Sequence, residues 1–185
     1  DILYNELNAT THPSIYLNQG KSLDFNNKIQ INNLDFKYEN SKNEIFKNLN
    51  LKINKYDCIG IIGASGSGKT TLIDLILGLQ RSNNGEIAID NFKLNNEGTI
   101  RLWQNNIGYV SQSTFILEDT TRKNIALSNS EDSINDKKVL SVLKSAQLSD
   151  YIERSEHGIH TKLGEKGINL SLGEQQRFGI ARALY

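Results

Sequence analysis

Cysteine, proline, methionine and net charge are scarce or absent in this sequence of 185 residues. The single cysteine excludes an internal disulfide and is typical of a reducing compartment. The 21 basic and 21 acidic residues cancel, which argues against a dedicated nucleic-acid-binding protein, because affinity for a phosphate backbone needs a clustered basic excess. No apolar run approaches the roughly 18 to 20 residues that cross a bilayer. The absence of methionine, even at position 1, predicts a piece of a longer protein.

The start of the chain differs in composition from the rest. Residues 1–27 are polar, contain the only proline, Pro13, and lack a sustained apolar period, so we interpret them as a linker. From residue 28 onward apolar residues recur, and a hydrophobic content of 37% suffices for a buried core. We expect a strand-rich core at 28–112 and a helical subdomain at 113–185, because the strand-like runs largely stop after Gln112.

Apolar spacing predicts alternating strands and helices. The unbroken apolar run at 58–62 is typical of a strand that is buried on both faces, and Cys58 within it is expected to serve packing. Further strands are expected at 28–38, 45–53, 85–90 and 107–110. Helices are expected at 71–79, 120–127, 132–148 and 171–185. The apolar face of the helix at 132–148 is expected to consist of Val139, Leu140, Val142, Leu143 and Ala146.

Residues 63–70, Gly-Ala-Ser-Gly-Ser-Gly-Lys-Thr, match the phosphate-loop pattern Gly-x-x-x-x-Gly-Lys-Ser/Thr in full, between a predicted strand and a predicted helix. Glycines let consecutive backbone N–H groups turn toward phosphate oxygens, and the following helix offers the positive end of its dipole to the same anion. Lys69 is expected to reach the β- and γ-phosphates, and the Thr70 hydroxyl to bind Mg²⁺. The expected nucleotide-binding residues here are Gly63, Ser65, Gly66, Ser67, Gly68, Lys69, Thr70 and Thr71.

The loop alone fits kinases, GTPases and ATPases alike, so the choice among them rests on motifs nearer the end of the chain. Residues 170–177 read Leu-Ser-Leu-Gly-Glu-Gln-Gln-Arg, and residues 180–184 read Ile-Ala-Arg-Ala-Leu. Together with the loop they resemble the nucleotide-binding domain of ATP-binding-cassette (ABC) transporters, over about residues 28–185. Residues 161–167, Thr-Lys-Leu-Gly-Glu-Lys-Gly, are similar to an element that precedes this signature motif in exporter-type members.

The resemblance implies roles for residues outside the loop. It implies an ATP site in which Tyr38 stacks on the adenine, while Gln112 contacts Mg²⁺ or the attacking water. It also implies that Ser171, Gly173 and Glu174 of a second copy approach the γ-phosphate, so that two domains share each site head to tail. From the residues alone, an ordinary strand aromatic is the commoner role of a tyrosine placed like Tyr38, and Gln112 fits a polar residue at a strand end.

The signature motif departs from the family pattern at two positions, because Leu172 stands where glycine is usual and Glu174 where glutamine is usual. Leucine removes backbone freedom and adds bulk. A carboxylate repels the triphosphate unless it turns back into the helix cap or pairs with a cation. Ser171 and Glu174 also fit the Ser-x-x-Glu pattern of a capping box, so a plain helix start is an alternative interpretation of this pair. We predict that the two domains close on a bound nucleotide more weakly than they would with the usual motif.

The resemblance further implies residues that do not occur in these 185: a metal-positioning Asp and a catalytic Glu after another hydrophobic strand, and a switch histidine. Asp90 follows an apolar run, but its position before Gln112 fits an ordinary surface strand. Lys69 and Gln112 remain as the catalytic candidates. We expect this chain to bind ATP with Mg²⁺ without hydrolysing it well, and the intact protein to hydrolyse it.

The expected fold class is α/β: a P-loop (RecA-like) core with an antiparallel β portion, a helical subdomain, and missing C-terminal strands. The implied function is to supply ATP energy to an exporter-type ABC transporter that exports a substrate or flips a lipid or lipid-linked saccharide. The implied partners are a second copy and a transmembrane domain fused upstream, at the cytoplasmic face of a bacterial inner membrane. The alternatives are a soluble ABC ATPase that acts on nucleic acid or ribosomes, a P-loop kinase or GTPase, and a binding-only module.

Overall fold

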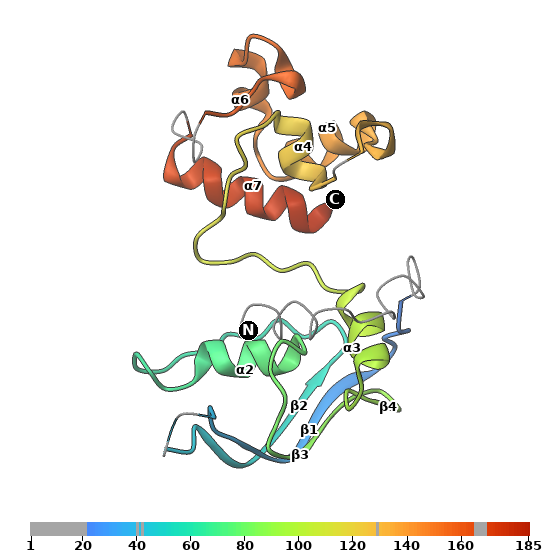
Figure 1. Ribbon diagram of the computed structural model, residues 1–185, viewed down its shortest axis with the longest axis vertical. Helices are drawn as coiled ribbons and strands as arrows, with labels where there is room; N and C mark the ends of the chain where they lie inside the picture. Colours follow the sequence, from blue (N-terminus) through green and yellow to red (C-terminus); the bar gives the residue numbers. More distant parts are fainter. Residues whose placement is uncertain (1–21, 40, 42, 129, 165–169) are drawn as a thin grey trace, which may run out of the picture. The chain divides into compact units, whose positions relative to one another are not determined.

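The computed structural model describes residues 22–39, 41, 43–128, 130–164 and 170–185, and the chain forms two compact units, 1–107 and 108–185 (Figure 1). The first unit contains β1 (Lys28–Phe36), β2 (Phe46–Asn54), α2 (Lys69–Ile76), β3 (Asn84–Ile89), β4 (Phe92–Lys93) and α3 (Glu97–Gln104). The second contains α4 (Thr121–Ala126), η2 (Glu131–Ser133), α5 (Asp136–Ser145), α6 (Ser149–Arg154), η3 (Gly158–His160) and α7 (Leu172–Leu184). Among the described residues, no helix is long and apolar enough to span a bilayer.

The four strands of the first unit form one antiparallel sheet in the order β2-β1-β3-β4. In β1 the buried residues Ile29 and Ile31 are followed by Leu34 and Phe36, and the register shifts between Ile31 and Leu34. Asn33, with φ +47°, lies at this irregularity and keeps both apolar pairs on the core face. The predicted strands at 28–38, 45–53 and 85–90 are confirmed with small changes of bounds.

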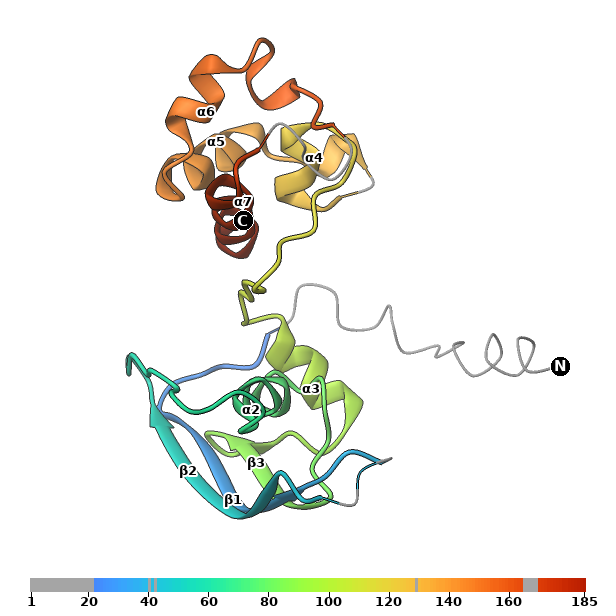
Figure 2. The same ribbon diagram turned by 90° about the vertical axis from the view of Figure 1, so that its left-hand side faces the viewer.

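Helices α2 and α3 lie against the same face of this sheet (Figure 2). Leu75 of α2 and Trp103 of α3 are buried in the core with the sheet residues. Two side chains of α3 also bind the end of α2, because Trp103 Nε1 donates to the Ile76 carbonyl at 2.8 Å and Gln104 Nε2 donates to the Leu77 carbonyl at 3.1 Å. The last turn of α2 is thereby fixed, and with it the direction of the helix.

Two predicted strands are absent from the structure: residues 58–62 and 107–110 have no regular secondary structure. The first run is exposed rather than buried, with Ile62 95% exposed, and Cys58 is exposed as well. A strand of this kind needs hydrogen-bonded neighbours on both sides. Neither run pairs with another strand among the described residues, so the prediction of burial, including the packing role of Cys58, is wrong for this structure.

The second unit is a helical cluster built around α7. Its core contains the fully buried residues Phe178 and Ala181 of α7, which pack with Val139 and Leu143 of α5. The ring of Tyr151 from α6 meets the ring of Phe178 edge to face, with centroids 5.4 Å apart. The predicted helices at 120–127 and 171–185 are confirmed as α4 and α7.

The single helix predicted at 132–148 is instead a short 3₁₀ turn, η2, followed by α5. Asn135 causes the break, because its side chain accepts a hydrogen bond from the Lys138 N–H at 3.1 Å and so caps the start of α5. Leu140, assigned to the apolar face, is 47% exposed, whereas Val139, Val142 and Leu143 are buried as predicted.

Most of the predicted linker, residues 1–21, lies outside the described residues. The remainder packs on the first unit: Leu23 is buried, and its N–H donates to the Leu102 carbonyl at 3.0 Å. Asn26 and Asn27 donate their backbone N–H groups to the carboxylate of Asp90. Residues 165–167 of the motif that precedes the signature also lie outside the described residues.

Candidate functional site

The predicted phosphate loop leads directly into α2, which begins at Lys69. Its N-cap residue, Gly68, has φ +88°, and no side chain caps the helix. A Cβ atom at this position would lie 2.7 Å from Cγ2 of Ile45, so both backbone angle and space call for glycine. The first turn of α2 contains no acidic residue. The first N–H groups of α2 therefore lack a side-chain acceptor and form the positive end of the helix dipole, which suits an anion.

Lys69 closes the loop on itself. Its Nζ atom donates to the carbonyl oxygens of Gly63 at 2.9 Å and Ala64 at 2.7 Å. The Ser67 N–H donates to the Ala64 carbonyl at 3.2 Å, which adds a turn inside the loop. The positive charge is thereby held beside an exposed ring of backbone at 63–67. Backbone N–H groups and a lysine ammonium group are the groups from which phosphate loops form an anion site.

The two threonines that follow Lys69 differ in their surroundings. Thr70 is exposed, and its hydroxyl has no hydrogen-bond partner among the described residues. Thr71 is 6% exposed, and its Oγ1 lies 3.1 Å from the hydroxyl oxygen of Tyr38. Of the two predicted ligands, Thr70 is thus free to bind a metal or phosphate, whereas the Thr71 hydroxyl is held by Tyr38.

Tyr38 follows the end of β1 rather than lying within it, and 40% of its surface is exposed. Its ring meets Phe36 edge to face with centroids 5.0 Å apart. Beside the ring is a hollow of about 530 Å³, which Tyr38 lines together with Phe36, Leu79 and neighbouring residues. A partly exposed ring that is held by its hydroxyl and by Phe36, in a residue that borders a hollow, is available to a planar ligand.

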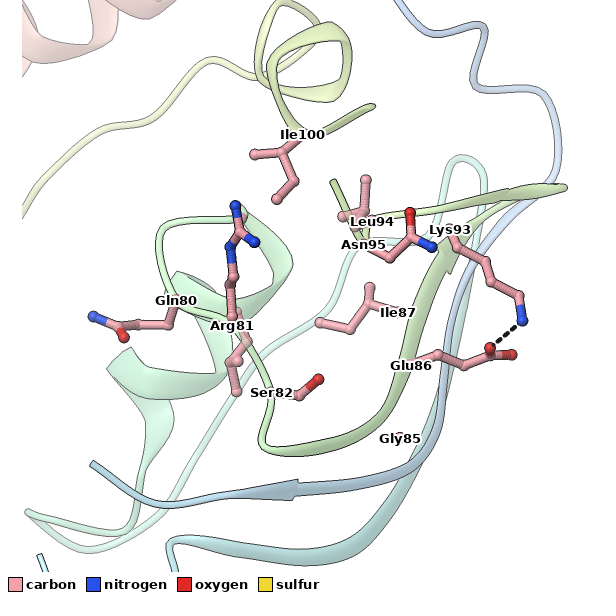
Figure 3. A pocket seen from close by; sticks show the side chains of 12 residues that line it. Gln80, Arg81, Ser82, Gly85, Glu86, Ile87, Lys93, Leu94, Asn95 and Ile100 are labelled. Carbon is pink, nitrogen blue, oxygen red and sulfur yellow. Dashed lines mark ion pairs between the residues drawn. The ribbon is translucent and has the colours of Figure 1, made fainter. Parts of the chain in front are cut away.

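A second pocket of the first unit, of about 360 Å³, lies at the end of α2 and between β3, β4 and α3 (Figure 3). Its rim contains the ion pair of Lys93 and Glu86, with Nζ and Oε2 2.6 Å apart. None of the predicted site residues lines this pocket, so it gives no support to nucleotide binding.

Asp90 is not a free carboxylate. Its oxygens accept three backbone hydrogen bonds, from Asn26 at 2.6 Å, Asn27 at 2.9 Å and Lys28 at 2.7 Å. Burial raises the pKa of this carboxyl, but the three N–H groups outweigh burial and lower the pKa overall. Asp90 therefore fixes the start of β1, in agreement with its rejection as a metal ligand.

Gln112 lies in the second unit, in the irregular segment before α4, where it is exposed and has no side-chain hydrogen bond among the described residues. This segment passes close to α7. Cβ atoms added at Gly108 and Gly179 would lie 2.9 Å from the Ala183 carbonyl oxygen and 2.7 Å from the Thr114 hydroxyl oxygen, respectively. Sequence reasoning missed this contact, although two small residues of α7 that are four positions apart, Gly179 and Ala183, could have indicated it.

The signature motif begins α7 with the capping box that the sequence predicts. The Ser171 hydroxyl accepts a hydrogen bond from the Glu174 N–H at 3.3 Å, and Glu174 Oε2 accepts from the Ser171 N–H at 2.8 Å. Glu174 is 7% exposed, and its other oxygen, Oε1, forms an ion pair with Arg154 at the end of α6. Burial raises the pKa of Glu174, but the Ser171 hydrogen bonds and Arg154 outweigh it and lower the pKa.

Both conditions under which Glu174 does not repel a triphosphate are therefore met: it turns back into the cap and it pairs with a cation. Leu172, the other departure from the family pattern, is 73% exposed. A Cβ at Gly173 would have only the end of the Arg177 side chain nearby, at 3.6 Å, so this glycine leaves open space at the helix start. Arg154 is a functional candidate that sequence reasoning missed, because no spacing rule links it to residue 174.

Comparison with known proteins identifies the class to which these features belong. The chain belongs to the ABC transporter family, whose model matches residues 46–185. Membership of this family implies that the chain binds ATP. The mixed α/β fold agrees with the structure of a bacterial Atm1-family ABC exporter with ATP bound: the TM-score is 0.81 and the identity 29%, over 99% of this chain and 32% of that one.

Two relatives in sequence carry the names of transport proteins. A Rickettsia typhi protein that carries the name export ATP-binding/permease protein is 40% identical over 159 residues, which are 84% of this chain and 27% of that protein. The ATP-dependent lipid A-core flippase of Coxiella burnetii is 35% identical over 157 residues, which are 85% of this chain and 26% of that protein. The chain thus spans about a quarter of the length of these relatives.

Proposed function

We propose that this chain is the ATP-binding domain of an exporter-type ABC transporter. The observation that carries the proposal is the start of α2, where an uncapped helix, a glycine with φ +88° and the Lys69 ammonium group meet at one exposed loop. These groups supply backbone donors, a dipole and a point charge for a triphosphate. Titration calorimetry of the full-length protein with ATP tests this: saturable binding is expected, and no heat of binding would contradict it.

We propose Thr70 as a ligand of the Mg²⁺ that accompanies ATP. Mg²⁺ prefers hard oxygen donors and binds through one or two protein groups, with phosphate oxygens and water filling the other positions. The free, exposed hydroxyl of Thr70, next to the residue that begins α2, fits that requirement. The role of Gln112 in metal binding or in positioning water remains a prediction from the resemblance. Thr70→Val should weaken ATP binding in the presence of Mg²⁺ and leave binding in EDTA nearly unchanged.

Binding and hydrolysis are separable in this proposal. Asp90, the carboxylate that follows an apolar strand, is occupied by three backbone N–H groups and is unavailable to position a metal or water. We therefore expect the 185-residue chain to bind ATP without appreciable turnover, whereas the intact transporter hydrolyses it. Phosphate release at a rate matching the full-length protein, in a preparation free of other ATPases, would contradict this expectation.

The proposed partners are a second copy of the domain and a membrane-spanning domain. The names of the relatives, export ATP-binding/permease protein and lipid A-core flippase, support transport at a bacterial membrane. We place the domain at the cytoplasmic face of the inner membrane, where ATP is available. Reconstitution of the full-length protein into liposomes should give ATP-dependent movement of a lipid or another cargo. ATP turnover that responds to nucleic acid and not to lipid would favour the alternative of a soluble ABC ATPase.

A further inference from the structure

The last residue of α6 reaches the first turn of α7. Arg154 Nη2 donates to Glu174 Oε1 in an ion pair between a guanidinium side chain that is 58% exposed and a carboxylate side chain that is 10% exposed. The guanidinium also lies over the ring of Tyr151, 5.6 Å from its centroid. Tyr151 is itself fixed, since its hydroxyl lies 3.0 Å from the Thr121 hydroxyl and its ring packs on Phe178. Arg154 is therefore held at Glu174 by its own helix.

Glu174 in turn controls the Ser171 hydroxyl. A serine hydroxyl has one hydrogen to donate. Here Ser171 Oγ donates it to Glu174 Oε2 at 2.8 Å and accepts from the Glu174 N–H at 3.3 Å. An anion that approaches Ser171 must therefore take over this hydrogen while Glu174 stays close by. The charge of Glu174 decides how costly that exchange is.

Arg154 places a positive charge next to Glu174, where the approach of an anion would otherwise be costly. A buried carboxylate without a partner is strongly disfavoured and repels a second anion, whereas a carboxylate paired with Arg is nearly neutral as seen from outside. Among the described residues, Arg154 is the cation that pairs with Glu174. An uncharged neighbour such as Ser171 would not compensate the charge of Glu174. No spacing pattern in the sequence indicates the pairing of residues 154 and 174.

We propose that Arg154 is a positioning residue for the signature helix. It holds Glu174 in the cap and neutralises its charge, so that the γ-phosphate of a nucleotide is able to approach Ser171. This inference rests on the proposed function, because it assigns the approaching anion to ATP. It concerns this chain's own substitution of Glu for the usual Gln, and it predicts that residues 154 and 174 depend on each other.

A double-mutant cycle in the full-length protein tests this dependence. The variants are Arg154→Met, Glu174→Gln and their combination, with KM and kcat for ATP hydrolysis as readouts. Arg154→Met leaves an uncompensated carboxylate and is expected to raise KM for ATP about three- to tenfold, a range discounted for the partial exposure of Arg154. Glu174→Gln alone should change KM less than about threefold. The double variant should return KM to near the wild-type value, because both charges are gone.

Matched controls separate charge from packing. Arg154→Lys keeps the charge and should retain most of the wild-type KM, and Arg154→Gln keeps a polar side chain without charge and should resemble Arg154→Met. Lys144→Met removes an exposed cation from α5 of the same unit and should leave KM unchanged. Thermal unfolding of each variant shows which are folded, and the Gln and Lys substitutions give the comparison if Arg154→Met does not fold.

Two outcomes would overturn the inference: a KM unchanged in both Arg154→Met and Arg154→Gln, or a double variant as impaired as the single variant. The second result would show that Arg154 acts only by packing on Tyr151. Failure of the proposed function has a different signature, since the wild-type protein would then neither bind nor hydrolyse ATP. Binding of ATP measured in EDTA should be the same for all variants, because the phosphate loop is unchanged.

Discussion

The starts of two helices differ in how they are capped: that of α2, which follows the predicted phosphate loop, and that of α7, which contains the signature motif. Helix α2 begins at a glycine in the left-handed region, with no side-chain cap and no acidic residue in its first turn. Helix α7 begins at Ser171 with a complete capping box and Glu174 in its first turn, backed by Arg154. One start leaves its N–H groups for an external anion, and the other contains an anion of its own.

This difference separates binding from stability. An uncapped start contributes little to folding and much to a ligand, because its donors remain unsatisfied until an anion arrives. A capped start contributes to folding at once and must be partly rearranged to receive a ligand. Substitutions in α2 should therefore be read out mainly in ATP affinity, and those in α7 mainly in unfolding.

Lys69→Ala should have the largest effect on binding. It removes the point charge and the two hydrogen bonds that close the loop, and we expect ATP affinity to fall about 100-fold, or about 3 kcal/mol. Titration calorimetry of the full-length protein measures this. Lys52→Ala, at an exposed position of β2, is the control and should bind as wild type. Equal affinities for the two variants would remove the distinction between the two helix starts.

Gly68→Ala should have the largest effect on stability within the loop. Alanine at φ +88° is strained, and its Cβ would lie 2.7 Å from Ile45, so we expect a loss of about 2–3 kcal/mol in the free energy of unfolding. Gly66→Ala, with φ +79° and no atom within 4 Å, isolates the backbone cost of about 1 kcal/mol. Gly60→Ala has neither problem and should be nearly neutral. Urea unfolding ranks the three, and a different order would contradict the role of Gly68.

Ser171→Ala tests the capped start. Loss of the N-cap hydroxyl should cost about 1–2 kcal/mol in the free energy of unfolding, since it also removes a partner of the buried Glu174. The control is Ser141→Ala, at an exposed position in the middle of α5, which should be neutral or slightly stabilising. If both variants unfold alike, the capping box does not hold the start of α7.

Local patterns in the sequence predicted both helix starts, because each start depends only on residues close together in the chain. The predictions that failed depend on contacts between distant segments. The phosphate loop and the capping box depend on residues at most seven positions apart, so spacing alone specifies them. Whether the run at 58–62 forms a strand depends on neighbouring strands, and its hydrophobicity reports only a preference for burial. The pairing of Arg154 with Glu174 joins two helices, and no local period marks it.

Helix boundaries also include one that the sequence predicted and one that it did not. Gly78, with φ +70°, ends α2 near the predicted position, because glycine adopts this conformation without strain. Asn135 was overlooked as a cap, and the helix predicted across it is divided. Apolar spacing located the buried residues Val139, Val142 and Leu143 of α5, but it also assigned Leu140 to the core face, and Leu140 is exposed.

Acid should weaken the start of α7. The folded-state pKa of Glu174 is lowered, so this carboxylate contributes stability above about pH 4 to 5, and that contribution is lost as pH falls through the lowered pKa. The difference in the free energy of unfolding between wild type and Glu174→Gln should therefore be larger at pH 7 than at pH 3. At both pH values it should be smaller than the loss caused by Ser171→Ala. Glu156→Gln, at an exposed position before η3, serves as the control. A difference independent of pH would show that Glu174 stabilises α7 by packing rather than by charge.

The smallest effect is expected where a hydroxyl supports the start of α2 from the side. Tyr38→Phe removes the contact between Tyr38 and the buried Thr71, and we expect a loss of about 0.5–1 kcal/mol in the free energy of unfolding. The ring remains, so ATP affinity should change less than about twofold if stacking uses the ring. Tyr56→Phe, at a ring that is 92% exposed, is the control and should change neither quantity. A large loss of affinity in Tyr38→Phe would show that the hydroxyl, through Thr71, rather than the ring, connects Tyr38 to the nucleotide.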